Sequence, residues 1–162
     1  MMTQKREAEV WQRVMAASAE CPPVQAAPVK PAVGLTAQQV MELLEKELLD
    51  VCTYRTLAGR VRKEQRRLLL QLAQAEQRHY RKLEAIYYLM TGQRPCPERP
   101  KAPCMACTSE ELRKRYQQEA AGAETYHKLA EQAGSFASVF HCLGHEEERH
   151  AAVILELLQR CL

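Results

Sequence analysis

All eight prolines of this 162-residue chain lie in two short stretches, four in residues 21–31 and four in residues 95–103. Proline lacks a backbone N–H and clashes with the preceding helical turn, so it interrupts helices. Long helices are therefore possible only outside these stretches. The prolines divide the chain into a short amino-terminal piece and two longer pieces of similar size.

The first longer piece predicts two helices separated by a turn. Thr36 and Gln39 have the spacing of a capping box, and helical periodicity continues from there to about residues 59–62. It resumes near residue 63 and runs to residue 90, where Gly92 follows as a terminator. This piece predicts a helical hairpin.

The second longer piece has the same organisation. Thr108 and Glu111 predict another capping box, helical spacing runs to about residue 133, and residues 134–135 interrupt it before it continues to the end. Leu, Ala, Glu, Gln, Lys and Arg dominate the composition, which favours helices over strands. We therefore predict an all-α fold, a four-helix bundle of two helical hairpins over residues 36–162.

Residues 1–20 predict an additional amphipathic helix, because Val10, Trp11, Val14 and Met15 recur at helical spacing. Residues 21–35 predict a proline-rich linker. Docking of this helix on the rest of the chain and docking on a partner both remain open.

The net charge and the distribution of apolar residues exclude several classes of partner. The net charge of +3 is too small to indicate a nucleic acid, and the basic residues between 60 and 67 are more typical of a solvated helical turn. No apolar run approaches the roughly 20 residues of a membrane span, and the amino terminus lacks a secretion signal. We expect a cytoplasmic protein with no membrane partner. The odd number of cysteines, seven, fits reduced thiols there.

The two hairpins carry one polar motif at matched positions. Each has a glutamate, a tyrosine seven residues later, and a Glu-x-x-His pair on its second helix: Glu47, Tyr54, Glu76 and His79 in the first, and Glu119, Tyr126, Glu147 and His150 in the second. The offset is 72 residues for the first two positions and 71 for the Glu-x-x-His pair. The deletion falls between residues 58 and 72, in the predicted turn, where deletions are tolerated.

These spacings make chemical sense on helices. Residues seven apart lie two turns apart on one face, and residues three apart lie about one turn apart. Two such hairpins packed about a pseudo-twofold axis would bring four carboxylates and two imidazoles to one interior point. That set of ligands suits iron or manganese, with carboxylates that can bridge two ions.

The doubled motif has two other interpretations. A Glu-rich sequence produces Glu-x-x-His pairs by chance, and a third pair, Glu124 and His127, aligns with Cys52 and Arg55 and so has no counterpart. We interpret that pair as a solvated surface pair. An old duplication could also retain only a structural bundle. Burying six ionisable groups without a metal would cost several kcal/mol each, which argues for a metal site.

This doubled motif over residues 36–160 resembles the ferritin-like superfamily, and within it the rubrerythrin-type di-iron domains. The resemblance implies terminal carboxylate ligands at Glu47 and Glu119, bridging carboxylates at Glu76 and Glu147, and one histidine ligand for each ion at His79 and His150. Tyr54 and Tyr126 would orient the carboxylates through hydrogen bonds, with core packing around a satisfied hydroxyl as their alternative.

The sequence departs from rubrerythrins in two ways. Their extra glutamate on the third helix would fall at Gly122, and no iron–sulfur domain follows the fourth helix. Cys104 and Cys107 form a lone C-x-x-C near Cys96, and both a redox or metal role and a role as ordinary loop cysteines stay open.

The resemblance implies an oxidoreductase of the peroxidase or ferroxidase kind with two iron ions, or manganese. It further implies an external electron donor, and we expect a homodimer. The sequence does not choose among peroxide reduction, iron oxidation and oxygen activation. The alternative is a non-catalytic helical bundle that acts as an interaction module.

Overall fold

The computed structural model describes residues 34–101 and 103–159, and all regular structure in these residues is helical. Four α-helices and one 3-10 turn follow one another along the chain: α2 (Ala37–Ala58), α3 (Lys63–Thr91), α4 (Thr108–Gln132), η1 (Gly134–Phe136) and α5 (Ala137–Gln159). The predicted all-α fold and the four helices of the bundle are confirmed. The predicted helix at 1–20 and nearly all of the linker at 21–35 lie outside the described residues.

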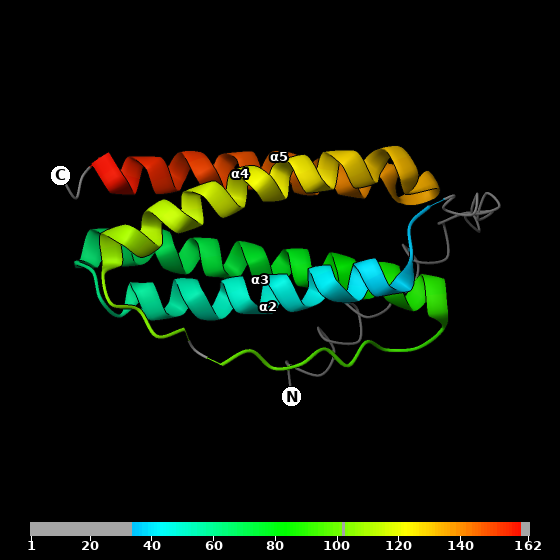
Figure 1. Cartoon of the computed structure of the whole chain (residues 1–162), viewed down its shortest axis with the longest axis horizontal. Coiled ribbons are helices and arrows are strands. Elements are labelled where there is room, and N and C mark those ends of the chain that lie inside the picture. The colour runs from blue at the N-terminus through cyan, green and yellow to red at the C-terminus, as the bar shows by residue number, and fades with distance from the viewer. Residues whose placement is uncertain (1–33, 102, 160–162) are drawn as a thin grey trace, which may run out of the picture. The chain divides into compact units, whose positions relative to one another are not determined.

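Helices α2 and α3 form one hairpin, and α4 and α5 form the other (Figure 1). The two hairpins lie face to face, and the connection between them runs along the first hairpin from the end of α3 to the start of α4 (Figure 1). The second half of this connection is anchored by a hydrogen bond, which Arg60 donates to the carbonyl oxygen of Met105. This is the arrangement of a four-helix bundle with one long crossover.

The helix ends agree with the predicted signals at all but one position. The Thr36–Gln39 capping box is present, with the Gln39 N–H donating to Thr36 Oγ1 at 3.2 Å and the Thr36 N–H donating to Gln39 Oε1 at 2.8 Å. Gly92 ends α3 in the left-handed conformation at φ 71°, which glycine adopts without strain.

The predicted capping box at Thr108 and Glu111 is wrong. Cys107 occupies the capping position with no side-chain hydrogen bond to the helix, and Thr108 is already the first helical residue. Helix α4 therefore begins one residue earlier than the box requires. Glu110 and Glu111 in its first turn favour that end through the helix dipole instead.

The core consists of two apolar clusters with polar residues between them. One cluster lies around Val40, Leu44, Leu83 and Phe140, and the other lies around Leu57, Leu69, Leu112, Ile154 and Leu157. Along each of the four helices, the predicted ligand positions fall between a stretch that belongs to one cluster and a stretch that belongs to the other. The apolar clusters thus close both ends of a polar layer at mid-bundle.

The surface of the described residues bears on two further predictions. The basic residues of the α2–α3 turn are all exposed, as predicted for a solvated turn: Arg60, Arg62, Lys63, Arg66 and Arg67. Within residues 34–101 and 103–159, none of the helices combines the length and the apolar character that a membrane span requires.

Candidate metal centre

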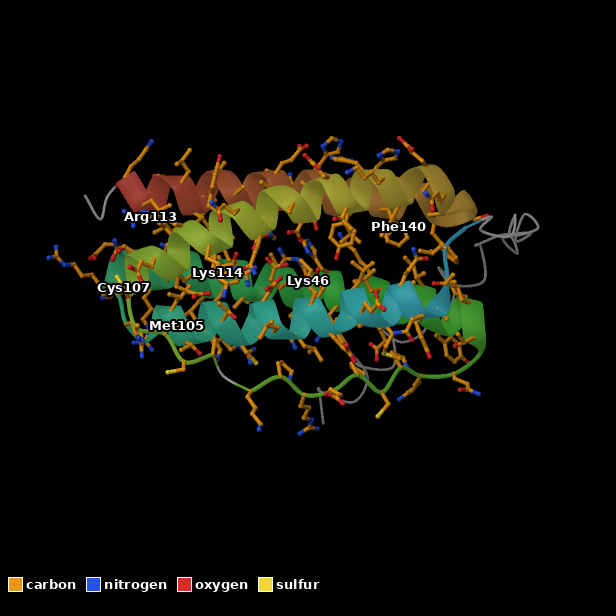
Figure 2. All side chains as sticks on the ribbon, viewed as in Figure 1. Lys46, Met105, Cys107, Arg113, Lys114 and Phe140 are labelled. Atoms are coloured by element: carbon orange, nitrogen blue, oxygen red, sulfur yellow. The ribbon has the colours of Figure 1, made fainter. Side chains whose placement is uncertain are left out.

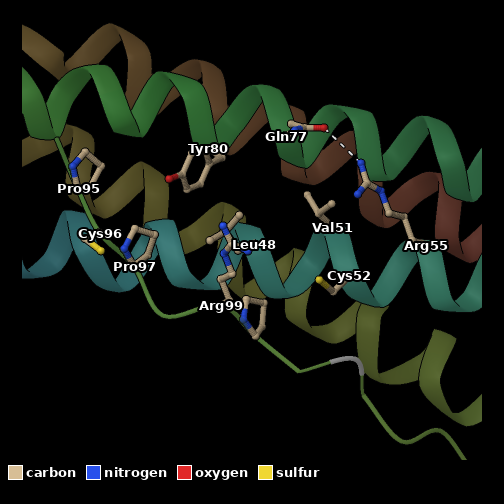
Figure 3. A pocket seen from close by; sticks show the side chains of 11 residues that line it. Leu48, Val51, Cys52, Arg55, Gln77, Tyr80, Pro95, Cys96, Pro97 and Arg99 are labelled. Carbon is tan, nitrogen blue, oxygen red and sulfur yellow. Dashed lines mark hydrogen bonds between the residues drawn. The ribbon is translucent and has the colours of Figure 1, made fainter.

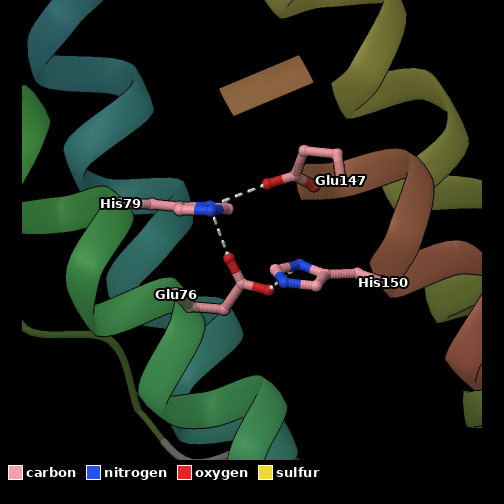
Figure 4. Close-up of side chains that lie close together, drawn as sticks. All are labelled: Glu76, His79, Glu147 and His150. Atoms are coloured by element: carbon pink, nitrogen blue, oxygen red, sulfur yellow. Dashed lines mark ion pairs between the residues drawn. The ribbon is translucent and has the colours of Figure 1, made fainter. Parts of the chain in front are cut away.

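The six predicted ligand residues meet inside the bundle. Glu47, Glu76, His79, Glu119 and Glu147 are completely buried, and His150 is 8% exposed. One ligand atom from each of Glu76, His79, Glu147 and His150 lies within 4.8 Å of the others (Figure 4). Charged groups are almost never buried this completely without partners, so the cluster is a candidate metal centre.

Glu76 lies between the two imidazoles. Its Oε2 atom is 3.0 Å from Nδ1 of His79, and its Oε1 atom is 2.8 Å from Nδ1 of His150 (Figure 4). Glu147 approaches His79 from the opposite hairpin, with Oε1 3.1 Å from Nδ1. The two rings are stacked with their centroids 5.2 Å apart.

The two remaining glutamates lie at opposite sides of this group. Glu47 Oε2 is 3.4 Å from Nδ1 of His79, and Glu119 Oε2 is 3.6 Å from Nδ1 of His150. Each half of the centre therefore has one imidazole nitrogen and one outer carboxylate oxygen. Glu76 lies between the halves.

Eight buried ligand atoms in these six residues have no hydrogen-bond partner, although several approach one another closely. They are both oxygens of Glu76 and Glu147, one oxygen each of Glu47 and Glu119, and Nδ1 of each histidine. Buried polar atoms in native proteins are nearly always satisfied. Eight unsatisfied atoms that point toward one region are the donor set expected for bound cations.

The tyrosines hold the other oxygens of the outer carboxylates. The Tyr54 hydroxyl donates to Glu119 Oε1, and the Tyr126 hydroxyl donates to Glu47 Oε1, so each tyrosine reaches across to the other hairpin. Burial, followed by the nearby carboxylate, raises the pKa of each phenol well above its ordinary value. Both tyrosines therefore stay neutral hydrogen-bond donors.

Three charged residues beside the centre were missed by the sequence reasoning. Lys46 Nζ lies 2.9 Å from Asp50 Oδ2, 3.4 Å from Glu47 Oε1 and 3.8 Å from Glu147 Oε2, in the region between the hairpins (Figure 2). Arg115 pairs with Asp50. Asp50 follows Glu47 by three residues and Arg115 precedes Glu119 by four, so helical spacing could have indicated both.

Gly122 explains how Lys46 and Glu147 fit together. A Cβ atom at this position would lie 2.9 Å from Glu147 Oε2 and 3.6 Å from Lys46 Nζ. The absence of a side chain at Gly122 leaves the space into which Glu147 and Lys46 reach.

Glu146 supports the ring of His79 from outside the cluster. Its Oε2 atom lies 2.7 Å from Nε2 of His79 and 3.0 Å from Nζ of Lys82. A carboxylate at Nε2 favours the tautomer with its proton there, which leaves the Nδ1 lone pair for an ion. No sequence pattern indicates this contact, because it depends on how α3 and α5 pack.

The pKa values show how strongly the groups act on one another. Burial tends to raise the pKa of each glutamate, yet the charge of Lys46, with His79, holds that of Glu47 at about 2. Burial prevails at Glu147, whose pKa is raised to about 9. Burial opposes the charged imidazoles, but the surrounding carboxylates raise the pKa of His79 to about 12 and that of His150 to about 9. Without an ion, both imidazoles hold a proton at neutral pH.

The cysteines do not form a second centre in the described residues. Cys96, Cys104 and Cys107 are exposed, and none of them joins a group of three or more metal-binding side chains within residues 34–101 and 103–159. Cys52 and Cys96 line a groove of about 520 Å³ under the proline-rich connection, away from the six ligand residues (Figure 3). Cys142 on α5 is exposed as well.

Comparisons with protein-family models, with curated proteins and with solved structures gave no match. The protein is thus characterised by its own architecture alone. It is a four-helix bundle whose interior holds a buried carboxylate–histidine group, and this group could hold metal ions.

Proposed function

We propose that this protein is a di-metal carboxylate protein, with two iron ions as its cofactor, that acts on peroxide or oxygen or oxidises iron. The observation that supports this best is the set of eight unsatisfied buried atoms. A single Glu-x-x-His pair would provide one nitrogen and two oxygens, but the bundle provides such a set from each hairpin.

The distribution of the unsatisfied atoms supports two ions rather than one. Glu47 and Glu119 each have one oxygen held by a tyrosine and one directed inward, as terminal ligands require. Glu76 and Glu147 have both oxygens without hydrogen bonds, as bridging ligands require. Each ion would then have one imidazole, one terminal oxygen and two bridging oxygens, so that positions remain for a substrate oxygen.

Charge favours the same assignment. Two divalent ions neutralise the four carboxylates of Glu47, Glu76, Glu119 and Glu147. Lys46 and Arg115, with Asp50 between them, add one further positive charge at the edge of the group. This surplus would favour the approach of an anionic substrate to the group. Iron and manganese suit this oxygen-rich set, and iron supplies one-electron redox chemistry between its +2 and +3 states.

The residues around the ions define what the protein itself contributes. The tyrosine hydroxyls fix the terminal carboxylates, Glu146 fixes the His79 ring, and the two apolar clusters close the ends of the polar layer. These contacts leave Glu76 and Glu147 the least restrained carboxylates, able to shift as the charge of the ions changes.

The first test is metal content after expression with iron and manganese offered together. We expect about two ions per chain, mostly iron, and a large loss in the Glu76→Ala/Glu147→Ala variant. Glu124→Gln is the matched control, since Glu124 is exposed and pairs only with Lys128. Peroxide consumption with a chemical reductant then tests the activity. A folded protein with no bound iron or manganese would refute the proposal and favour the interaction-module alternative.

A further inference from the structure

A second group of metal-binding side chains lies on the outer surface of the α4–α5 hairpin. It comprises His127 on α4 with His145 and Glu148 on α5, and one ligand atom of each lies within 4.8 Å of the others. Glu148 connects them, with Oε1 3.1 Å from Nε2 of His127 and Oε2 3.1 Å from Nδ1 of His145. The side chains are 30%, 66% and 55% exposed for His127, His145 and Glu148, so solvent ions reach them.

The position of His127 depends on a glycine. A Cβ atom at Gly144 would lie 2.6 Å from Cε1 of His127 and 2.8 Å from both ring nitrogens. The imidazole therefore packs directly on the backbone of α5, one helical residue before His145. This close approach fixes the ring beside its partners. Glu124 and His127 both lie at the surface, as interpreted from the sequence, but Glu124 pairs with Lys128 and His127 with Glu148.

A third imidazole extends the group. The His141 ring centroid lies 5.8 Å from that of His127, and the His145 centroid lies 4.9 Å from it. His141, His145 and Glu148 follow one another at intervals of four and three residues, so they share one face of α5. Three of the five histidines in the chain thus gather outside the buried centre.

We propose that His127, His145 and Glu148 form a separate surface site for one divalent metal ion, of the kind represented by Zn²⁺, Cu²⁺ and Ni²⁺. Two imidazoles and one carboxylate suit Zn²⁺, Cu²⁺ or Ni²⁺, whereas Mg²⁺ and Ca²⁺ prefer all-oxygen sites. Water, or His141 after a rotation of its side chain, would complete a tetrahedral set. The site does not require the buried centre to be loaded, because its ligands point away from the bundle interior.

The test is a calorimetric titration of the full chain with ZnCl₂ in excess Mg²⁺. We expect His127→Asn/His145→Asn to lose one zinc ion per chain. Glu124→Gln/Lys128→Ala, which removes the neighbouring exposed ion pair on α4, should keep it. All cysteines are present in every variant, so zinc bound by thiolates cancels in the comparison.

Two further variants separate this site from the buried centre and from a loss of fold. Glu76→Gln/Glu147→Gln disables the proposed di-metal centre and should leave the histidine-dependent zinc in place. Gly144→Ala keeps every ligand but displaces the His127 ring, so it should weaken that zinc at least about tenfold, in line with the usual effect of disturbed ligand orientation. Equal zinc stoichiometry and affinity in the wild type and in His127→Asn/His145→Asn would overturn the proposal.

Discussion

The two hairpins contribute the same ligands to the buried centre, but they surround them differently. At equivalent positions, Tyr54 and Tyr126 make mirrored hydrogen bonds across the bundle. The outer carboxylates lie at nearly equal distances from their imidazoles, 3.4 Å in the first half and 3.6 Å in the second. The pairing is therefore retained where atoms face the proposed ions.

The symmetry ends just outside these atoms. Glu146 lies against Nε2 of His79, but the residue that matches Glu146 at the offset of 71 is Ala75, which has no polar side chain to offer His150. Asp50, which pairs with Lys46 and Arg115, has Gly122 as its match at the offset of 72. The ligand atoms are thus alike in both halves, whereas the residues that contact the ligands from outside differ between the halves. The two proposed ion positions would consequently not be equivalent.

The largest expected effect that separates the halves is on pH dependence. His79 and His150, with pKa values of about 12 and about 9, both hold a proton at neutral pH without an ion. An ion must displace the proton at Nδ1 of each ring, and Glu147, whose pKa is raised to about 9, must also lose its proton to act as a ligand, so filling both positions releases three protons. The overall binding constant for two ions should therefore rise about 1000-fold per pH unit between pH 6 and 8.

Anaerobic Fe²⁺ calorimetry in buffers of different ionisation enthalpy measures this release directly. The first ion should enter the His150 half, because its proton is held less strongly, and the His79 half should fill at higher pH. Binding that is independent of pH, or proton uptake instead of release, would contradict the assignment of the imidazoles as ligands.

A smaller effect is expected when the support of His79 is removed. Glu146→Ala leaves Nε2 of His79 without its carboxylate, so the ring loses its fixed tautomer and orientation. Supports of this kind typically contribute 10- to 100-fold in metal affinity, and we expect a loss of about that size for one of the two ions. Iron titration followed by elemental analysis measures it.

Glu124→Ala is the matched control for Glu146→Ala. Both glutamates pair with a lysine, Glu124 with Lys128 at 3.4 Å and Glu146 with Lys82 at 3.0 Å, but only Glu146 contacts an imidazole of the centre. If the two variants bound iron equally well, or if Glu146→Ala weakened both ions to the same extent, the proposed difference between the halves would be wrong.

Local and periodic features of this chain could be predicted from its sequence, whereas contacts between neighbouring helices could not. Helix positions and the six converging residues were predicted because proline placement, helical spacing and an internal repeat are all local or periodic signals. Glu146 and the Gly144–His127 contact were not predicted, because they depend on how neighbouring helices pack side by side. Asp50 and Arg115 lie between these cases, since their spacing was visible but the ion pair that they form with each other joins α2 to α4.

The smallest expected effect tests the part of the centre where the halves agree. Tyr54→Phe and Tyr126→Phe each remove one hydrogen bond to a buried carboxylate, worth roughly 1.5–3 kcal/mol. Part of that energy is lost in the metal-free protein too, so we expect iron affinity to fall by only about tenfold in each variant.

Because the two hydrogen bonds are equivalent, the losses of iron affinity in the two variants should agree within about threefold. The double variant should show the product of the two losses if each tyrosine acts on its own ion. Iron titration of the three variants measures this, and a tenfold or greater difference between Tyr54→Phe and Tyr126→Phe would mean that the divergence of the halves extends to the ligands themselves.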